Sequence, residues 1–327
     1  MTIMDIANMA GVSPSTVSNV LNGRKNVGDE TRKKVIQLCR DNGYEIEKKS
    51  TRIGSDPRTI LFIFSDFDRK FYLEIIHGIS DYVYSKDYDM IVSTTKSCSK
   101  FMDAEFTSGA IVLDRKCEDD ILSQKAENGY RIVTLDRMIP SQNIKSVIVN
   151  NYTPMSEMVQ GLVEMGYEKY AYLAGPDTLD NRERFQAFRD VLEKNRITFR
   201  RENYLMGDFS EKSGYRAAKL MLLAENIPDV LVCANDNMAV GAMEALREEH
   251  INIPEDIAIT GFDGTEKSDL QNLTTVDIPR YEEGYLAAQF LIQNLIGKGD
   301  NSTFRIAAKV KWRGTTAKKK VNNSEDK

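Results

Sequence analysis

The chain of 327 residues contains only two histidines and four cysteines. Few side chains are therefore available for histidine-based acid–base catalysis or metal binding. The cysteines stand far apart, without the spacing of metal ligands, at positions Cys39, Cys98, Cys117 and Cys233. We expect them to be reduced thiols that fill the core of a cytoplasmic protein. No metal and no other cofactor is predicted.

The sequence also lacks the short motifs of common enzyme classes. It contains no Gly-x-Ser-x-Gly elbow, no phosphate-binding Gly-x-x-x-x-Gly-Lys loop and no Gly-x-Gly-x-x-Gly fingerprint. No combination of nucleophile, base and acid is visible either. We therefore expect a protein that is not an enzyme.

Long apolar runs are missing as well. No stretch approaches the ~18 apolar residues of a membrane span, and we expect neither a membrane segment nor a signal peptide. The net charge is −5, but its distribution is uneven. Residues 1–58 contain ten basic and seven acidic residues, whereas the remainder contains 34 and 42. The basic part is the candidate nucleic-acid module, and the acidic part would limit non-specific adhesion.

The first forty residues predict two short helices joined by a tight turn. Thr2 can cap a helix that has Asp5 in its first turn, and Gly11 ends that helix. Ser13 can cap the second helix, and a proline follows it at the first helical position. Apolar residues repeat at helical spacing in both. This pattern predicts a helix-turn-helix, completed by a third helix over about 29–42.

The outward face of the second helix carries short polar side chains, namely Ser15, Thr16, Ser18 and Asn19. Hydroxyl and amide groups of this kind match phosphate oxygens and base edges in the major groove. Together with Ser13 and Asn22, they are the predicted DNA contacts. The alternative is a small structural helical cap with a solvated polar face.

A family resemblance is carried by residues at fixed offsets in this segment: Thr2-Ile3-Met4-Asp5-Ile6-Ala7, Ala10-Gly11-Val12-Ser13, Thr16-Val17-Ser18-Asn19-Val20-Leu21-Asn22-Gly23, Thr31-Arg32-Lys33-Lys34-Val35 and Gly43-Tyr44. On these residues the segment resembles the DNA-binding domain of the lactose-repressor/galactose-repressor (LacI/GalR) family. The family usually has Arg where this chain has Asn19. Because Arg prefers guanine and Asn prefers adenine, we expect the operator to differ at that base.

A charged segment over 46–58 is predicted to link this domain to the rest of the chain. The resemblance implies a hinge helix here that orders on operator DNA and inserts a side chain into the minor groove, with Ile53 at that position. Ile46-Glu47 and Ser50-Thr51 depart from the family pattern. A plain flexible tether is the alternative.

From Thr59 onward, short apolar runs alternate with helical patterns. The runs have the length of buried strands and include 60–64, 110–113, 131–135, 170–173 and 230–233. This alternation predicts an α/β fold with parallel sheets covered by helices on both faces. A second set begins near Asn151, so we expect two doubly wound lobes. The family resemblance implies that one helix of the first lobe is shortened within 95–109, and a single strand is expected near Phe304 to Val310.

Further motifs extend the resemblance over nearly the whole chain, among them Ile75-Ile76-His77-Gly78-Ile79, Leu173-Ala174-Gly175-Pro176, Asn235-Asp236-Asn237-Met238-Ala239-Val240-Gly241 and Gly261-Phe262-Asp263. Two such lobes resemble the periplasmic-binding-protein-like fold that the family has behind its DNA-binding domain. The expected boundaries are 1–45 for the helix-turn-helix, 46–58 for the linker, 59–150 plus 279–305 for lobe 1, 151–278 plus 306–317 for lobe 2, and 318–327 for a polar tail. Lacking heptads, the tail does not predict a tetramerising coiled coil.

Ligands of doubly wound sheets bind beyond the carboxyl ends of the strands. Aromatic, acidic, amide and basic side chains at these ends can bind a small polar molecule. By resemblance, effector contacts map onto Phe71, Tyr72, Asp136, Arg184, Asn235 and Asp263. Structural alternatives remain for these side chains. Arg184 could pair with Glu183 or Asp180, Asp263 could stabilise a turn, Asp236 could cap its own helix, and the two aromatic residues could belong to the core.

The resemblance implies a cytoplasmic transcriptional regulator, a repressor, that binds double-stranded operator DNA and a small-molecule effector such as a sugar. One small module buries limited area on DNA, so we expect a homodimer on a pseudo-palindromic operator, with the helix after Asp66 in the dimer contact. The alternatives are the same regulator under a protein corepressor, a solute-binding protein and an α/β enzyme. The missing catalytic motifs argue against the enzyme.

Overall fold

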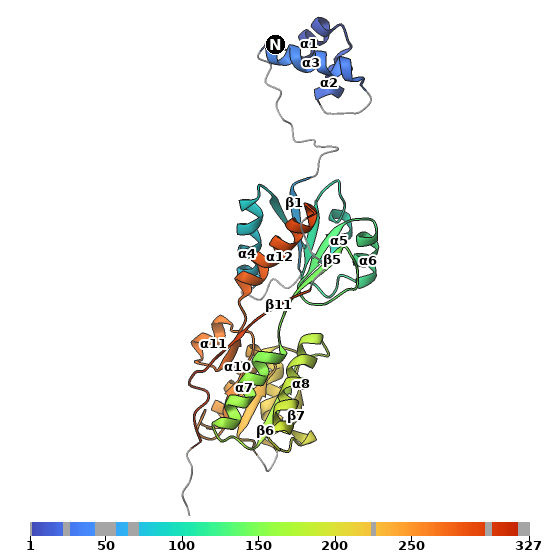
Figure 1. Cartoon of the computed structure of the whole chain (residues 1–327). Helices are drawn as coiled ribbons and strands as arrows, with labels where there is room; N and C mark the ends of the chain where they lie inside the picture. Colours follow the sequence, from blue (N-terminus) through green and yellow to red (C-terminus); the bar gives the residue numbers. More distant parts are fainter. Residues whose placement is uncertain are drawn as a thin grey trace, which may run out of the picture.

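The computed structural model describes residues 2–21, 27–42, 57–64, 72–223, 227–297 and 303–319, with the backbone alone at Arg40. Along the chain, a small helical unit is followed by two α/β lobes (Figure 1). Among the described residues, no helix is both long enough and apolar enough to cross a membrane.

Three helices form the N-terminal unit: α1 (Ile3–Ala10), α2 (Pro14–Leu21) and α3 (Asp29–Asp41). Helix α1 begins with a reciprocal cap. The Asp5 amide donates to Thr2 Oγ1 at 3.3 Å, and the Thr2 amide donates to Asp5 Oδ2 at 2.8 Å. The helix ends at Gly11, whose φ of 69° suits a residue without a Cβ. The predicted first cap and the helical stop are confirmed.

The apolar faces of the three helices pack into one small core. Its buried residues are Ile6, Ala7, Ala10, Val17, Val20, Val35 and Cys39. These residues recur every three or four positions along their helices, as burial of one helical face requires. The predicted helix-turn-helix with a supporting third helix is therefore confirmed.

The first lobe contains a parallel sheet with the strand order β11-β5-β4-β3-β1-β2. The strands are β1 (Thr59–Ile63), β2 (Asp89–Ser93), β3 (Gly109–Val112), β4 (Arg131–Thr134), β5 (Ile144–Val149) and β11 (Phe304–Ile306). The helices are α4 (Tyr72–Ser85), α5 (Thr95–Phe101), α6 (Asp119–Glu127) and α12 (Arg280–Leu295). Helix α5 has seven residues and lies in the stretch where the family resemblance implies a shortened helix.

Strand β1 shows why a continuous apolar run forms a strand in this lobe. Ile60 and Phe62 pack into a cluster with residues of α4 and α12. Leu61 and Ile63 pack on the opposite face, into a cluster with residues of α5 and α6. Because helices cover both faces, the four buried positions Ile60 to Ile63 are all apolar and do not alternate with polar residues.

The second lobe has a parallel sheet in the order β7-β6-β8-β9. The strands are β6 (Tyr170–Ala174), β7 (Tyr204–Met206), β8 (Val230–Cys233) and β9 (Ala258–Thr260). The helices are α7 (Tyr152–Glu164), α8 (Leu179–Lys194), α9 (Glu211–Leu222), α10 (Asp236–Glu248) and α11 (Glu266–Leu270), with a 3-10 turn at Arg201–Asn203. The sequence does not predict β7 or α11, because elements this short show no period.

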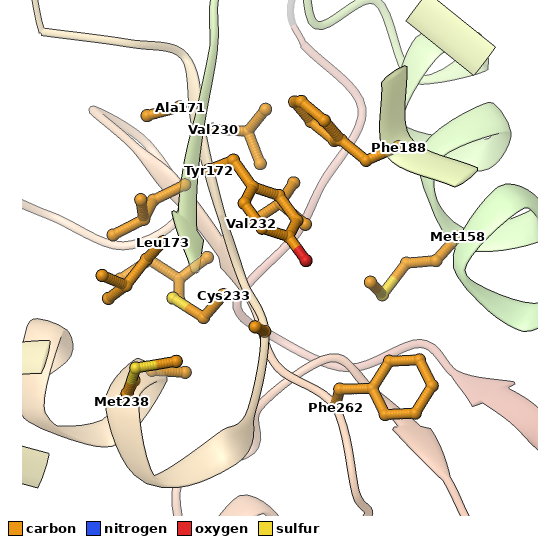
Figure 2. Packing of buried hydrophobic residues seen from close by; sticks show 14 of the residues in the cluster. Met158, Ala171, Tyr172, Leu173, Phe188, Val230, Val232, Cys233, Met238 and Phe262 are labelled. Atoms are coloured by element: carbon orange, nitrogen blue, oxygen red, sulfur yellow. The ribbon is translucent and has the colours of Figure 1, made fainter. Parts of the chain in front are cut away.

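The core of the second lobe lies between this sheet and its helices. Figure 2 shows Tyr172 of β6 and Val232 of β8 among side chains from the helices, including Phe188 of α8 and Met238 of α10. The Tyr172 ring contacts the Phe188 ring, with centroids 4.9 Å apart. This core makes the second lobe a packed unit in its own right.

The chain crosses between the lobes near its C-terminal end. Strand β10 (Thr275–Asp277) leads into α12, and β12 (Lys309–Lys311) runs antiparallel to β10 after the chain has left β11. The single strand expected near Phe304 to Val310 is therefore wrong. Strand β11 pairs with β5 of the first lobe, whereas β12 pairs with β10, because the chain changes sheets between them.

Each lobe contains one pair of helices whose backbones approach closely. A Cβ at Gly78 of α4 or at Gly284 of α12 would lie 2.0 or 2.1 Å from a backbone oxygen of the facing helix. In the second lobe, Gly214 of α9 and Gly241 of α10 stand in the same reciprocal relation, at 2.0 and 1.9 Å. Both lobes thus contain a helix pair in which each helix has a glycine where the two backbones approach.

Candidate functional sites

The start of α2 is organised by hydroxyl groups. Ser13 Oγ accepts from the Thr16 amide at 3.1 Å, so Ser13 caps the helix as the sequence predicts. Its oxygen also lies 2.7 Å from Ser15 Oγ and 2.8 Å from Thr16 Oγ1. The helix therefore presents a connected group of hydroxyls at its N-terminus, where backbone amides favour phosphate oxygens.

The other predicted DNA contacts lie along the polar face of α2. Ser15 is exposed, and Thr16, Ser18 and Asn19 are half-buried, while the valines of the helix pack inward. The predicted contacts Asn22 and Ile53 lie outside the described residues. The face that can enter a groove thus consists of short polar groups, with an amide at Asn19 able to read a base edge.

A cavity of about 740 Å³ lies between the two α/β lobes, a size that suits a small ligand. The first lobe contributes Tyr72, Leu113, Asp136, Arg280 and Glu283, among others. The second contributes Pro176, Arg184, Phe209, Asn235 and Asp263, among others. Five of the six side chains predicted to contact an effector line this one cavity. The sixth, Phe71, lies outside the described residues.

Arg184, on α8, is the most extensively bonded of these side chains. Its Nε donates to Asn151 Oδ1 at 2.8 Å, its Nη1 donates to the Ala234 carbonyl at 2.6 Å, and its Nη2 lies 3.4 Å from Asp263 Oδ1. The guanidinium also stacks on the Phe262 ring, 3.8 Å from its centroid. Arg184 therefore bonds to residues of other segments, and not to Glu183 or Asp180 as the alternative interpretation proposed.

Asn235 lines the cavity but also caps α10. Its Oδ1 accepts from the Met238 amide at 3.0 Å, and its Nδ2 donates to the Phe209 carbonyl at 3.2 Å. The alternative that Asp236 caps its own helix is wrong, since its carboxylate accepts from Thr265 and from Thr275.

Asp236 is fully buried. Burial, reinforced by the neighbouring Asp263 carboxylate, raises the pKa of the Asp236 carboxyl to about 7. The residue connects the start of α10 with Thr265, which follows β9, and with Thr275 of β10.

Asp136 follows β4 and lies at the wall of the cavity. Its Oδ2 accepts from Arg137 Nη1 at 2.8 Å and lies 3.8 Å from Arg115 Nε. Its Oδ1 is buried and has no hydrogen-bond donor among the residues that the structure describes. Burial raises the pKa of the Asp136 carboxyl, and the two arginines oppose that rise.

Arg280 and Glu283, at the start of α12, are site residues that the sequence analysis misses. Arg280 Nη1 donates to Glu283 Oε2 at 2.9 Å, and Arg280 Nη2 lies 3.5 Å from Asp263 Oδ1. The signal that could reveal them is their place directly after the chain crosses back to the first lobe. Phe209 is missed because it follows β7, which is too short to predict. Arg115 follows β3, so it lies beyond the carboxyl end of a strand, where ligands of doubly wound sheets bind.

Several ion pairs join the two lobes around the cavity. Arg115 of the first lobe lies 3.8 Å from Asp180 of the second, and Arg280 and Asp263 form a second such pair. Beside the cavity, Arg305 of β11 donates to Glu183 of α8 at 2.9 Å. Charged groups at or near the cavity therefore make direct contacts between the two lobes.

Two family models match this chain. The model of bacterial regulatory proteins of the lacI family matches residues 2–45, and that of the periplasmic binding protein-like domain matches residues 159–316. Catabolite control protein A of Priestia megaterium is 25% identical, over 96% of this chain and 99% of its own length. The probable HTH-type transcriptional repressor ExuR of Bacillus subtilis is 26% identical, over 93% and 94%.

Among solved structures, the lac repressor dimer bound to operator and the anti-inducer ONPF is similar over nearly its whole length. Its TM-score is 0.73 at 27% sequence identity, and the match covers 97% of this chain and 99% of that chain. The order of the two matched domains is that of the helix-turn-helix and the lobes described above. The similarity therefore extends over the DNA-binding unit and both lobes.

Proposed function

Because this chain belongs to the lacI family of bacterial regulatory proteins, with a periplasmic-binding-protein-like domain behind its helix-turn-helix, we propose that it is an effector-controlled, homodimeric repressor of metabolic genes. The effector is a small polar metabolite, such as a sugar, that binds between the lobes. The repressor acts in the cytoplasm on double-stranded operator DNA.

The observation that carries this proposal is the composition of the interlobe cavity. Tyr72 of α4, Arg184 of α8, and Asp136 and Asp263, which follow β4 and β9, line the same space of about 740 Å³. An aromatic ring, carboxylates and a guanidinium in one cavity can bind a small molecule that has hydroxyl groups and a flat apolar face. Neither histidine lines this cavity.

Effector control requires two arrangements of the protein that differ in effector affinity. An effector can shift operator affinity only by its preference for one arrangement over the other. The ion pairs Arg115–Asp180 and Arg280–Asp263 cross between the lobes at the cavity wall. A ligand that contacts both lobes here would strengthen or break these pairs, and would thereby favour one arrangement.

A dimer follows from the size of the DNA-binding unit. A single module of this size buries roughly 600–1,000 Å² on DNA, so specific affinity needs two copies. Two-fold symmetry of the protein then requires a pseudo-palindromic operator. Ser13, Ser15, Thr16 and Ser18 would contact phosphates or bases, and Asn19 would select adenine at one position of each half-site.

The experiment that tests this function uses the full chain and two measurements. First, bound sequences are selected from random DNA duplexes at an ionic strength of about 0.15 M. We expect a two-fold symmetric consensus. Second, affinity for that operator is measured with a library of sugars, nucleosides and amino acids. At least one compound should change the affinity by about tenfold, or 1.4 kcal/mol. Binding without preference for any palindrome would contradict the proposal.

A further inference from the structure

We infer that the ion pair between Glu183 and Arg305, which lies outside the cavity, sets the balance between two arrangements of the lobes before any ligand binds. The inference rests on the proposed function, in which effector control requires two such arrangements. Their balance fixes how much effector a response needs, because ligand affinity is reduced by the fraction of protein in the binding-competent arrangement. Neither residue is among those that line the cavity, so a ligand there does not displace the pair.

The pair joins the two lobes directly. Arg305 lies on β11, which pairs with β5 in the sheet of the first lobe, and Glu183 lies on α8 of the second. Arg305 Nη1 donates to both carboxylate oxygens of Glu183, at 2.9 Å and 3.2 Å. The other two interlobe ion pairs described above have longer contacts, of 3.5 and 3.8 Å. Of the three, the Glu183–Arg305 pair is therefore the tightest contact between the lobes.

The pair lies beside the segments in which the chain passes between the lobes. One of these segments follows β5 at Asn151, and another follows β11 at Ile306, where the lobes meet (Figure 1). The two segments are hydrogen-bonded, since the Asn150 amide donates to the Ile306 carbonyl at 2.8 Å. Arg305 precedes this passage, and Glu183 belongs to the lobe beyond it. A change in the angle between the lobes would therefore alter the distance between the two charged groups.

Asn151 connects this pair with the cavity. The residue is 1% exposed, so its polar atoms need partners within the protein. Its Oδ1 accepts from Arg184 Nε at 2.8 Å. Its Nδ2 donates to Asp180 Oδ1 at 3.1 Å and lies 3.5 Å from Glu183 Oε2. One side chain at the passage between the lobes thus contacts both a cavity arginine and the carboxylate of the interlobe pair.

Charge holds α8 against the first lobe. The first two turns of the helix carry the carboxylates of Asp180 and Glu183, which face Arg115 and Arg305 of the first lobe. The Glu183 side chain is 18% exposed, so solvent screens its charge less than that of a surface residue. Removal of the Arg305 charge should therefore weaken the attraction between the lobes, and reversal of that charge should turn this attraction into repulsion.

The test measures the lobe arrangement in the full chain, without DNA or effector. Gln124→Cys on α6 and Glu193→Cys on α8 place one exposed labelling site in each lobe. The four native cysteines are buried, so spin labels attach to the two introduced ones. The labelled chain is mixed with an excess of unlabelled chain, so that a dimer holds one labelled protomer. Pulsed electron paramagnetic resonance then gives the distribution of distances between the two labels.

Three changes of the pair have graded expected effects. Arg305→Met should raise the population of a second label distance by about two- to fivefold, and Glu183→Gln should do the same. Arg305→Glu should raise it by at least about tenfold, because a third carboxylate then lies beside Glu183 and Asp180. If Arg305→Glu does not fold, the two neutral variants still decide the question. Unchanged distances in the folded variants would overturn the inference.

Exchange of the two charges separates electrostatic attraction from a structural role of Arg305. Glu183→Arg together with Arg305→Glu restores an ion pair between the lobes and should return most of the distribution to that of the wild type. A double variant that stays as shifted as Arg305→Glu would overturn the inference, since the charges would then not be the cause.

Arg182→Met is the matched control. Arg182 lies on the same helix and forms an ion pair of 2.8 Å with Asp177, which belongs to the same lobe. Its replacement removes an arginine charge without removing a contact between the lobes, so the label distances should stay unchanged. A shift as large as that of Arg305→Met would contradict the special role of the interlobe pair. Thermal melting of every variant identifies any loss of folding.

The outcomes separate this inference from the function on which it rests. The same variants are titrated against the two-fold symmetric duplex that the wild type selects. A shift in label distance with unchanged affinity for that duplex supports the role of the pair and contradicts control of DNA binding by lobe arrangement. Unchanged label distances overturn the role of the pair and leave the proposed function to its own test. If no duplex is selected, the proposed function fails and the label distances still decide the role of the pair.

Discussion

Asp236 is a buried carboxyl group whose ionised form is disfavoured by its surroundings. Its carboxyl is fully buried, and its pKa is raised to about 7 by burial and by Asp263, from an ordinary value of 3.8. The folded protein therefore binds this proton more tightly than the unfolded chain does. Its contribution to stability is fully present below the ordinary pKa and is lost as the pH rises through the folded pKa.

Replacement of this carboxyl should remove that pH dependence. We expect the free energy of unfolding of the wild type to fall relative to that of Asp236→Asn between about pH 4 and pH 7, with a slope of up to about 1.4 kcal/mol for each pH step of one. Urea unfolding of both proteins at several pH values across this window measures the difference. A difference that stays constant with pH would show that Asp236 titrates normally.

Arg184 combines a structural role with its place in the cavity. Its side chain is 7% exposed and its partners lie on three separate loops. Arg184→Met should lower the free energy of unfolding by roughly 3–5 kcal/mol, because Asp263 then loses a buried cation. It should also abolish the effector response, while operator affinity without effector stays unchanged below the melting transition. Urea unfolding and operator titration measure the two effects.

The control for Arg184 removes the charge of its partner as well. Arg184→Met with Asp263→Asn should recover part of the lost stability, since no carboxylate is then left without the Arg184 guanidinium, while Arg280 keeps its ion pair with Glu283. An additive loss in the double variant would indicate that the two side chains do not interact.

Asn19 belongs to the DNA-binding face. Asn19→Ala should relax base preference at one position of each half-site, at a cost of about 1–3 kcal/mol for the preferred operator. Operators altered singly at each position, titrated against the wild type and the variant, locate that base. Asn8→Ala on the exposed side of α1 is the matched control and should leave the preference intact. If Asn19→Ala had the same base preference as the wild type, Asn19 would not read a base.

At the scale of elements, the paired helices α4 with α12 and α9 with α10 depend on glycine at their crossing points. A methyl group on Gly214 would lie 2.0 Å from the carbonyl oxygen of Met238, and backbone at that distance has to move. We expect Gly214→Ala to lower the free energy of unfolding by about 1–3 kcal/mol, as other overpacked sites do.

Gly28→Ala is a matched control for this substitution. The added methyl group of Gly28→Ala meets nothing within 4 Å, and no positive φ opposes it. Its melting temperature should equal that of the wild type. If Gly214→Ala also melted like the wild type, the close approach of α9 and α10 would not constrain the fold.

At the scale of the whole molecule, DNA binding and effector sensing lie in separate parts of the chain. The N-terminal unit has its own core of seven buried residues, and each lobe has its own clusters. Deletion of residues 1–58 should therefore abolish operator binding and leave a folded dimer that still binds effector. Light scattering, calorimetry and operator titration of the truncated protein check the three claims. Residual specific binding to the operator would contradict this division.

Much of the fold could be predicted because its signals are local. The caps at Thr2 and Ser13, the stop at Gly11 and the apolar run at 60–64 each lie within a few residues of the element they define. Where the chain uses very short elements the signals fail. Strands β7 and β10 have three residues each, and β11 and β12 divide a stretch that reads as one strand.

The sequence by itself determined the helix-turn-helix, the two α/β lobes and the side chains at the strand ends, since helical period, caps and strand runs depend on near neighbours. Only the tertiary structure decided which of those side chains meet. Arg184 and Asp263 are 79 residues apart, and Glu183 and Arg305 are 122 residues apart. Their pairing depends on how α8, β9 and β11 are placed, and no local pattern contains that information.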